Sequence, residues 1–297
     1  MDKIYTVSAV LAALILPYIL WCIIEPFFFD LDSAVLKRSS GEGSRDKGIT
    51  VKKLPPVSAT GTDKPDLRFF FFSDIHTEWC PVSSGRLCNA IRKSHLETPL
   101  DAVIFGGDIV TYPRNAKNGY KYLSAVSSCC KELGIPFYGV SGNHDSDLIN
   151  APEASGFISL DNRTVTLNSN KNGTEITLAG LPDSGRKNRV WSSKMPCGNE
   201  TPVILVVHDP DAFIHLDPGN RPEYMLSGHL HGGQMKFPFR IEFTVLRKSD
   251  KLPQMGAVQG PYDISGTKVF ISRGLGCGLL PFRFLSVPEA TVIGIFL

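Results

Sequence analysis

Five short polar motifs in this chain contain side chains of the kinds that bind divalent metal ions. In chain order they are Asp74-Ile75-His76, Gly107-Asp108, Gly142-Asn143-His144-Asp145, His208-Asp209 and Gly228-His229-Leu230-His231. Their carboxylate, imidazole and amide groups suit hard or borderline divalent metals, and no thiolate is among them. Five of the seven histidines of the chain fall in these motifs. The motifs therefore predict a metal centre built from oxygen and nitrogen ligands.

Each motif directly follows a short apolar run that is typical of a strand buried on both faces. Side chains at the carboxyl ends of such strands gather at one edge of an open α/β sheet. The runs cover residues 67–73, 102–106, 137–141, 203–207 and 224–227. Further strands are predicted at 164–167, 175–181, 268–272 and 291–297, and helices at 85–95 and 116–133. Gly134 is placed to end the second helix. The pattern predicts a layered α/β domain.

The spacing of the ligands indicates how they are shared between ions. Asp74 and His76 are two residues apart, so at an extended strand end both side chains leave on the same side and bind one ion. His229 and His231 have the same spacing, which directs them toward neighbouring ions. Glycines beside several of these residues let the backbone pass close to the site.

Composition and charge exclude several other classes of function. The chain has 297 residues, 42% of them hydrophobic, and its formal net charge of +2 gives no reason to expect nucleic acid as a partner. Its seven cysteines include no C-x-x-C pair, which argues against a structural zinc ribbon. A domain of this size has core enough without disulfides, so buried free thiols are expected.

The amino-terminal segment predicts a membrane anchor. Residues 4–24 carry no charged side chain, and about 21 residues of helix span about 30 Å, the thickness of the hydrocarbon core of a bilayer. A cleaved signal peptide is the rival interpretation, but its apolar core is normally about 7–15 residues long. Glu25-Pro26 ends the run and makes a poor cleavage site. We therefore expect an uncleaved, single-pass anchor.

Three regions follow from this. Residues 1–32 are the predicted transmembrane anchor, 33–65 a flexible linker rich in Ser, Gly, Thr, Lys and Pro, and 66–297 the catalytic domain. Lys37 and Arg38 favour a catalytic domain on the cytoplasmic side under the positive-inside rule.

The ordered motifs D-x-H, G-D, G-N-H-D, H and G-H-x-H resemble those of the calcineurin-like metallophosphoesterase superfamily over nearly all of residues 68–297. The resemblance implies a four-layer α-β-β-α sandwich in which two mixed sheets pack face to face. It also implies two divalent metal ions, for which we expect Mn, with Fe, Zn or Mg as alternatives. The implied ligands are Asp74, His76 and His231 for the first ion, Asn143, His208 and His229 for the second, and Asp108 as the bridge.

The same resemblance gives roles to the two residues after Asn143. His144 would be the acid that assists the leaving group, and Asp145 would orient the ring of His144. Together these residues would hydrolyse a phosphodiester or pyrophosphate bond. A non-catalytic scaffold with the same fold is the alternative from another class, but no ligand is missing and His144 is present.

The carboxyl-terminal part narrows the resemblance. Residues 228–234, 272–276 and 281–283 are similar to a bacterial membrane-associated branch that includes YkuE-like phosphoesterases and the chlamydial-type UDP-2,3-diacylglucosamine pyrophosphatase. The implied partners are the lipid bilayer and a lipid-linked or nucleotide-sugar-lipid substrate such as UDP-2,3-diacylglucosamine. A general phosphodiesterase with another substrate is the alternative.

Two further features bear on the substrate. Arg273 and Arg283 are candidates to bind a second phosphate group through two hydrogen bonds each, and structural salt bridges are the alternative. Residues 235–267 interleave apolar and positive side chains, which suits contact with a lipid interface. A hairpin packed on the domain core is the competing interpretation of that insert.

Overall fold

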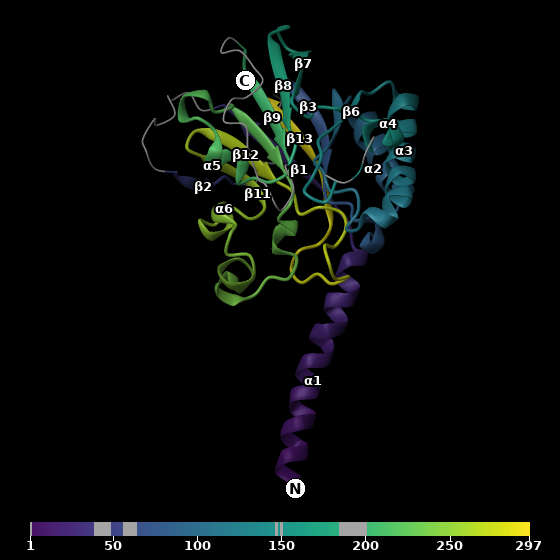
Figure 1. Ribbon diagram of the computed structural model, residues 1–297, viewed down its shortest axis with the longest axis vertical. Helices are drawn as coiled ribbons and strands as arrows, with labels where there is room; N and C mark the ends of the chain where they lie inside the picture. The colour runs from purple at the N-terminus through teal and green to yellow at the C-terminus, as the bar shows by residue number, and fades with distance from the viewer. Residues whose placement is uncertain (1, 39–48, 56–63, 146–147, 149–150, 184–200) are drawn as a thin grey trace.

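A computed structural model describes residues 2–38, 49–55, 64–145, 148, 151–183 and 201–297 of the chain. Within these ranges two β-sheets pack against each other, and a long amino-terminal helix projects from one end of the domain (Figure 1). That helix, α1, runs from Asp2 to Ile24.

The first sheet has the strand order β1-β13-β3-β4-β5-β6 in the described part of the chain. Strands β3 to β6 are mutually parallel, β13 is antiparallel to β3, and β1 is parallel to β13. The bounds are β1 Asp30–Lys37, β13 Glu289–Phe296, β3 Leu67–Phe72, β4 Ala102–Phe105, β5 Phe137–Gly139 and β6 Ile158–Ser159.

The second sheet has the order β2-β11-β12-β10-β9-β8-β7 over the same described residues. Its central strands β12, β10, β9 and β8 are parallel, and β2, β11 and β7 add antiparallel edges. The bounds are β2 Val51–Lys53, β11 Gly260–Ile264, β12 Thr267–Ile271, β10 Tyr224–Ser227, β9 Val203–Val207, β8 Glu175–Leu181 and β7 Arg163–Asn168.

Helices cover the outer faces of the sheets. The first sheet is covered by α2 Ser84–Glu97, α3 Ala116–Leu133 and α4 Ala151–Ser155. Gly134, predicted to stop the second helix, caps α3 with a left-handed φ of 68°. The outer face of the second sheet carries the short helices α5 Ala212–His215 and α6 Lys251–Gln254. Single helical turns are η1 Glu25–Phe27, η2 Thr77–Trp79, η3 Pro113–Asn115, η4 Pro218–Asn220, η5 His231–Gly233, η6 Pro238–Arg240 and η7 Glu242–Leu246.

Strand β3 shows why the apolar runs lack alternation. Phe69 and Phe71 point into the core between the two sheets, whereas Phe70 and Phe72 pack beneath the helices of the first sheet. All four are fully buried. A strand with a hydrophobic layer on each face needs apolar residues at every position. The predicted α/β architecture with two packed mixed sheets is confirmed.

The predicted linker is partly wrong. Residues 33–37 of it belong to β1, which begins at Asp30 inside the predicted anchor and pairs with β13 from Asp30 opposite Glu289 to Lys37 opposite Phe296. Residues 51–53 form β2 at the edge of the second sheet. The open edges of β13 and β11 supply the hydrogen bonds that order these two strands. Residues 39–48 and 56–63 of the predicted linker lie outside the described residues.

The predicted anchor corresponds to α1 and the turn η1 that follows it. Among the residues that the structure describes, no helix is both long and apolar enough to cross a membrane. Within α1, the side chains of residues 2–4, 6–12 and 14 lie outside that description.

Phe71 provides a test of the core between the sheets, where its ring meets that of Phe270 edge to face with centroids 6.2 Å apart. Phe71→Ala should lower the free energy of unfolding by about 3–5 kcal/mol, because it leaves a cavity between two rigid sheets. Urea denaturation measures this loss. Leu96→Ala is the control, since Leu96 is 81% exposed on α2 and its truncation should change stability by less than about 0.5 kcal/mol.

Candidate metal centre

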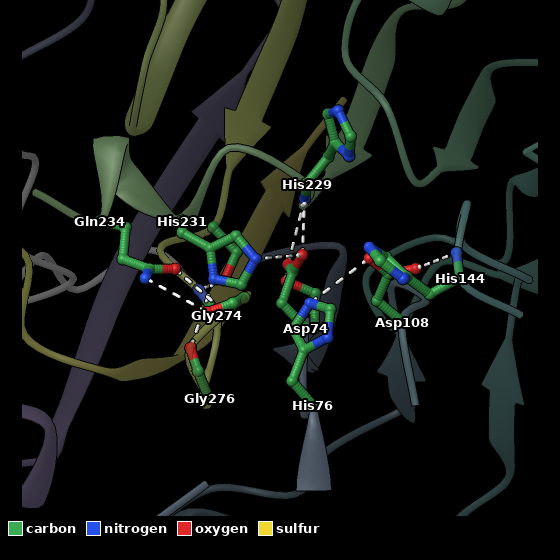
Figure 2. Close-up of polar contacts among 12 residues, drawn as sticks. Asp74, His76, Asp108, His144, His229, His231, Gln234, Gly274 and Gly276 are labelled. Carbon is green, nitrogen blue, oxygen red and sulfur yellow. Dashed lines mark hydrogen bonds and ion pairs between the residues drawn. The ribbon is translucent and has the colours of Figure 1, made fainter. Parts of the chain in front are cut away.

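The five predicted motifs meet where strands from both sheets end. Asp74 and His76 follow β3, Asp108 follows β4, and Asn143 follows β5 in the first sheet. His208 follows β9 and the pair His229 and His231 follows β10 in the second sheet. Figure 2 shows Asp74 at the middle of this group, with His231 on one side and Asp108 on the other. The site therefore joins the two sheets.

The ligands form two groups that match the assignment from sequence. Asp74, His76 and His231 make one triad, and Asp108, His208 and His229 make the other. In each triad the potential ligand atoms lie within 4.8 Å of one another. All six side chains are buried, with exposures between 0 and 9%. His229 and His231 thus fall in different triads, and their division between neighbouring ions stays a prediction.

Asp108 links the two triads. Its Oδ2 lies 3.4 Å from Nε2 of His76 in the first triad and 3.2 Å from Nε2 of His208 in the second. His208 Nε2 is also 3.9 Å from Oδ1 of Asp74. One carboxylate within reach of imidazoles from both groups is the arrangement that a bridging ligand requires.

Asn143 completes the donor set. Its side-chain oxygen and nitrogen are both buried and make no hydrogen bond within the described structure. A buried amide without a partner costs free energy unless another group satisfies it. Carboxylate, imidazole and amide donors together fit two hard or borderline divalent cations, and a cation beside Asn143 would satisfy its oxygen.

The backbone at the ligands differs from the prediction. Asp74 and His76 do not leave an extended strand end, because their φ angles are 51° and 42°. Asp108, His229 and His231 also have left-handed φ angles of 63°, 69° and 52°. Such conformations cost about 1–3 kcal/mol each for non-glycine residues and persist where surrounding contacts enforce them. Here the backbone takes left-handed turns after β3, β4 and β10, and these turns aim the side chains at one point.

Two glycines leave room for the carboxylates. A Cβ added at Gly142 would lie 2.2 Å from Oδ1 of Asp108, and one at Gly228 would lie 2.4 Å from Oδ2 of Asp74. Any larger residue would therefore displace a metal ligand. The glycine of G-N-H-D and the first glycine of G-H-x-H are required by this close approach.

Hydrogen bonds behind the imidazoles fix their orientation. His208 Nδ1 lies 2.7 Å from the carbonyl oxygen of Gly106, and His231 Nδ1 lies 3.3 Å from that of Gly276. His76 Nδ1 lies 3.1 Å from Oγ1 of Thr111. In these three rings Nε2 is the nitrogen left for the site. A second hydrogen bond that fixes the ring and its tautomer is typical of metal-binding histidines.

The electrostatics of His76, His231, Asp74 and Asp108 favour the protonation states that bind metal, whereas at His208 burial acts downward but Asp108 raises the pKa of the imidazole well above its usual value. Burial lowers the pKa of His76 to about 4 and that of His231 well below its usual value. Burial also raises the pKa of Asp74 to about 6, which leaves it ionised at neutral pH. Burial alone would raise the pKa of Asp108, but the neighbouring imidazoles of His208 and His76 hold it well below the ordinary range. Neutral imidazoles and ionised carboxylates are the forms that coordinate cations.

The predicted role of Asp145 needs correction. Its carboxylate accepts hydrogen bonds from the backbone N–H groups of Asp108, Ile109 and Gly142 at 2.7–2.8 Å. It therefore holds the loop that carries the bridging residue. The ring of His144 is instead hydrogen-bonded through Nδ1 to the carbonyl oxygen of Thr111 at 3.0 Å. His144 is half-buried, unlike the ligands around it.

The two predicted substrate arginines are held by the protein itself. Arg283 is fully buried, and its guanidinium donates to the carbonyl oxygens of Arg273, Gly274, Gly276 and Ser286. Arg273 is paired with Glu289 at 2.6 Å, Asp32 at 2.8 Å and Asp30 at 3.2 Å. These contacts correct the phosphate-binding prediction, because Nη1 and Nη2 of Arg283 and Nε and Nη2 of Arg273 are directed at protein partners. The alternative of structural salt bridges holds for Arg273, whereas Arg283 donates to backbone carbonyl oxygens instead.

Glu78 was missed by the sequence analysis. Its carboxylate accepts hydrogen bonds from the backbone N–H groups of Thr111 and Tyr112, both at 2.9 Å, and from Nδ2 of Asn115 at 2.7 Å. It thus fixes the loop whose Thr111 contacts both His76 and His144. A carboxylate two residues after the D-x-H motif was the available signal, but its partners lie more than 30 residues away in the chain.

Comparison with known proteins identifies relatives of this site. A model of the family "Calcineurin-like phosphoesterase" matches residues 67–233, which include all five motifs. The chain is 32% identical over 209 residues to the uncharacterized metallophosphoesterase YkuE of Bacillus subtilis, covering 66% of this chain and 68% of that protein. It is 28% identical over 234 residues to the uncharacterized metallophosphoesterase YkoQ of the same organism, covering 76% and 82%. Among solved structures, TT1561 of Thermus thermophilus aligns with a TM-score of 0.39 and 13% identity over 70% of this chain and 90% of that one.

Replacing Asp108 tests the bridge. Asp108→Ala should bind fewer than two ions per chain and lose turnover, because two cations would then repel each other across a short gap without a shared carboxylate. Elemental analysis of the purified protein measures the metal content. Glu97→Ala, which removes an exposed carboxylate of α2, should keep both ions. Two ions per chain in Asp108→Ala would contradict the bridging assignment.

Proposed function

The chain belongs to the calcineurin-like phosphoesterase family, and we propose that it hydrolyses a phosphodiester or pyrophosphate bond in a membrane-associated lipid. The family and the two buried triads together make it a metal-dependent phosphoesterase, a hydrolase. The lipid substrate, of which UDP-2,3-diacylglucosamine is the example implied by the carboxyl-terminal motifs, is the proposal. The observation that carries it is the exposed apolar surface beside the metal centre.

The metal centre explains the reaction class. Two divalent cations, for which we propose Mn²⁺, would when bound lower the pKa of a water molecule and offset the charge of the phosphoryl group. Asp74, His76 and His231 would hold one cation, Asn143, His208 and His229 the other, and Asp108 both. The left-handed backbone at Asp74, His76, Asp108, His229 and His231 places these donors before any substrate arrives, so little reorganisation accompanies the reaction.

His144 is suited to protonate the leaving oxygen. Its Nδ1 is held by the carbonyl oxygen of Thr111, an acceptor that requires Nδ1 to carry hydrogen, so Nε2 is the nitrogen through which the ring would act. Its backbone N–H donates to Oδ1 of Asp108 at 2.9 Å, which fixes its distance from the metal centre. The His144 ring also lies 5.2 Å from that of His76, centroid to centroid.

An apolar rim lies next to the first triad. The rim comprises Leu279, Leu280 and Leu285, which are 58–60% exposed. Gly278 precedes them, and a Cβ added there would lie 3.6 Å from Nε2 of His231. Gln234 ties the rim to the metal motif through hydrogen bonds to the carbonyl oxygens of Gly278 and Leu280. Exposed leucines this close to a polar centre suit a substrate with an apolar part.

The insert after the metal motif extends the rim. Its start is joined to the rim by hydrogen bonds between Gln234, Lys236 and Phe284. The insert forms helical turns at 238–246, with Phe243 buried in the core but Phe239 92% and Val245 61% exposed, and only its last residues form a hairpin, in which β11 pairs with β12. Two positive side chains of the same segment, Arg240 and Lys248, are exposed as well. Aromatic and aliphatic side chains mixed with positive charge favour contact with a lipid surface that has anionic headgroups.

The position of α1 supports attachment to a membrane. The helix leaves the domain at the edge formed by the insert and the rim (Figure 1), and the described side chains of its second half, such as Ile15, Leu16, Ile19 and Leu20, are exposed and apolar. We propose that residues 4–24 anchor the chain, with the catalytic domain on the cytoplasmic side. An anchor there would bring the rim and the metal centre to the bilayer surface.

The acid role of His144 is testable with leaving groups. His144→Gln should keep both metal ions, because it removes no ligand, and should slow hydrolysis of esters with poor leaving groups by about 10²–10⁴-fold, the usual contribution of a general acid. The loss should be much smaller for p-nitrophenyl esters, whose leaving group scarcely needs a proton. An equal loss for both ester types would contradict the role.

The lipid substrate is tested by comparing two substrates in the presence of Mn²⁺. The full-length protein should hydrolyse UDP-2,3-diacylglucosamine in vesicles as well as soluble bis-p-nitrophenyl phosphate. Phe239→Ser and Leu280→Ser should each slow the vesicle reaction by up to about tenfold, the order expected for lost apolar burial of one such side chain. Neither should change hydrolysis of the soluble diester.

Leu96→Ser is the matched control, because Leu96 is equally apolar and exposed but lies on α2 away from the rim. It should leave both rates unchanged. If the protein hydrolysed the soluble diester but not the lipid, it would be a general phosphodiesterase, and the proposal of a lipid substrate would be wrong.

A further inference from the structure

The last turns of α1 pack against the segment 283–286. The carbonyl oxygen of Cys22 accepts a hydrogen bond from the backbone N–H of Arg283 at 3.0 Å. The ring of Tyr18 lies 4.7 Å from that of Phe284, centroid to centroid. The carboxyl-terminal end of α1 is therefore packed into the domain.

Glu25, directly after α1, is the polar centre of this contact. It is 1% exposed. Its Oε2 accepts hydrogen bonds from the backbone N–H of Leu285 at 2.8 Å and from Nε1 of Trp21 at 2.6 Å. Its Oε1 accepts a third from the backbone N–H of Ser286. A buried carboxylate that receives two consecutive backbone amides fixes the conformation of that backbone.

The segment that Glu25 fixes holds the metal ligand His231 from two sides. Ser286 Oγ donates to the carbonyl oxygen of His231 at 2.6 Å. Arg283 donates to the carbonyl oxygens of Ser286 and Gly276, and the latter oxygen is the one that lies 3.3 Å from Nδ1 of His231. The backbone of His231 is therefore held by Ser286, which Glu25 binds directly. The ring of His231 is held through Gly276 and Arg283, and Arg283 is linked to Glu25 through Ser286.

We propose that Glu25 is a positioning residue for the first metal site, through Ser286 and Arg283 to His231. The proposal rests on the assignment of His231 as a ligand of that site, which is part of the proposed function. Toward the metal centre, His231 Nε2 lies 3.4 Å from Asp74 Oδ1, and the His231 ring stacks on that of His76. The segment fixed by Glu25 supports the side of the ring away from those ligands.

A selective effect on metal affinity follows. The second triad, Asp108, His208 and His229, receives none of the hydrogen bonds of Glu25, Ser286 Oγ or the Arg283 guanidinium described above. Loss of Glu25 should therefore loosen one site and spare the other. Groups behind a metal ligand typically change metal affinity by about 10–100-fold when removed.

The experiment is a titration of the metal-free, full-length protein with Mn²⁺, followed by calorimetry and by electron paramagnetic resonance of the bound ion. Glu25→Ala should weaken one of the two Mn²⁺ sites by about 10–100-fold and leave the other within about twofold of wild type. Glu25→Gln, which keeps one acceptor oxygen, should give a smaller loss. Hydrolysis of bis-p-nitrophenyl phosphate should recover at saturating Mn²⁺, because every ligand is still present.

Asp66→Ala is the matched control. Asp66 is also a buried carboxylate, 4% exposed, that accepts a backbone N–H, from Leu297, and the hydroxyl of Ser169. It precedes β3, at the opposite end of that strand from the metal ligands. Its loss should lower stability but leave both Mn²⁺ affinities unchanged, which separates general destabilisation from positioning.

Wild-type affinity at both sites in a folded Glu25→Ala protein would overturn the proposal. If that variant does not fold, Glu25→Gln and Ser286→Ala decide, since each removes one link of the chain to His231, and wild-type affinity in both would overturn it equally. The titration uses no substrate, so its outcome is independent of whether the vesicle assay supports a lipid substrate.

Discussion

Three aspartates buried at one point, Asp74, Asp108 and Asp145, impose the constraint on which the rest of the structure depends. They are 0–4% exposed, and buried carboxylates require hydrogen bonds or countercharge. Asp145 receives three backbone N–H groups, and Asp74 receives the N–H of His229 and the hydroxyl of Ser73. Asp108 faces the imidazoles of His76 and His208. Two cations in this donor set would supply the remaining compensation.

The two-sheet architecture is what brings these charges together. The parallel strands β3, β4 and β5 of one sheet and β9 and β10 of the other end at the same edge, and most of them turn there through a left-handed residue or a glycine. The strands that precede those residues are buried on both faces, and their rigid packing enforces the strained left-handed conformations. A rigid hydrophobic scaffold thus carries a polar centre that no single sheet contains.

The amino-terminal segment ties the proposed membrane side of the molecule to its chemistry. Glu25 is inside the domain, and Asp30 and Asp32 of β1 pair with Arg273. Arg273 and Arg283 then order the loop that follows β12 and reaches His231. Both arginines were predicted from the sequence to bind phosphate, but in the structure they connect α1, the first sheet and the metal centre. The exposed rim of Leu279, Leu280 and Leu285 lies on this same loop.

The sequence by itself predicted which residues make up the two triads, because each of these residues stands in a motif directly after an apolar run. Motifs in which the residues are two apart can be recognised without reference to any distant part of the chain. The sequence also indicated which strands are buried, because a strand with a hydrophobic layer on each face needs apolar side chains at every position, as in β3 and β4. Only the tertiary structure decided the left-handed turns that aim Asp74 and His76, the roles of Asp145 and the two arginines, and the inclusion of β1 in the first sheet. For Asp145 and Arg273 the deciding partners lie far away in the chain: 36 to 37 residues for Asp145, and more than 240 between Asp30 or Asp32 and Arg273. A local pattern records the character of a side chain, whereas the hydrogen bonds that fix its role depend on which distant backbone groups the fold places beside it.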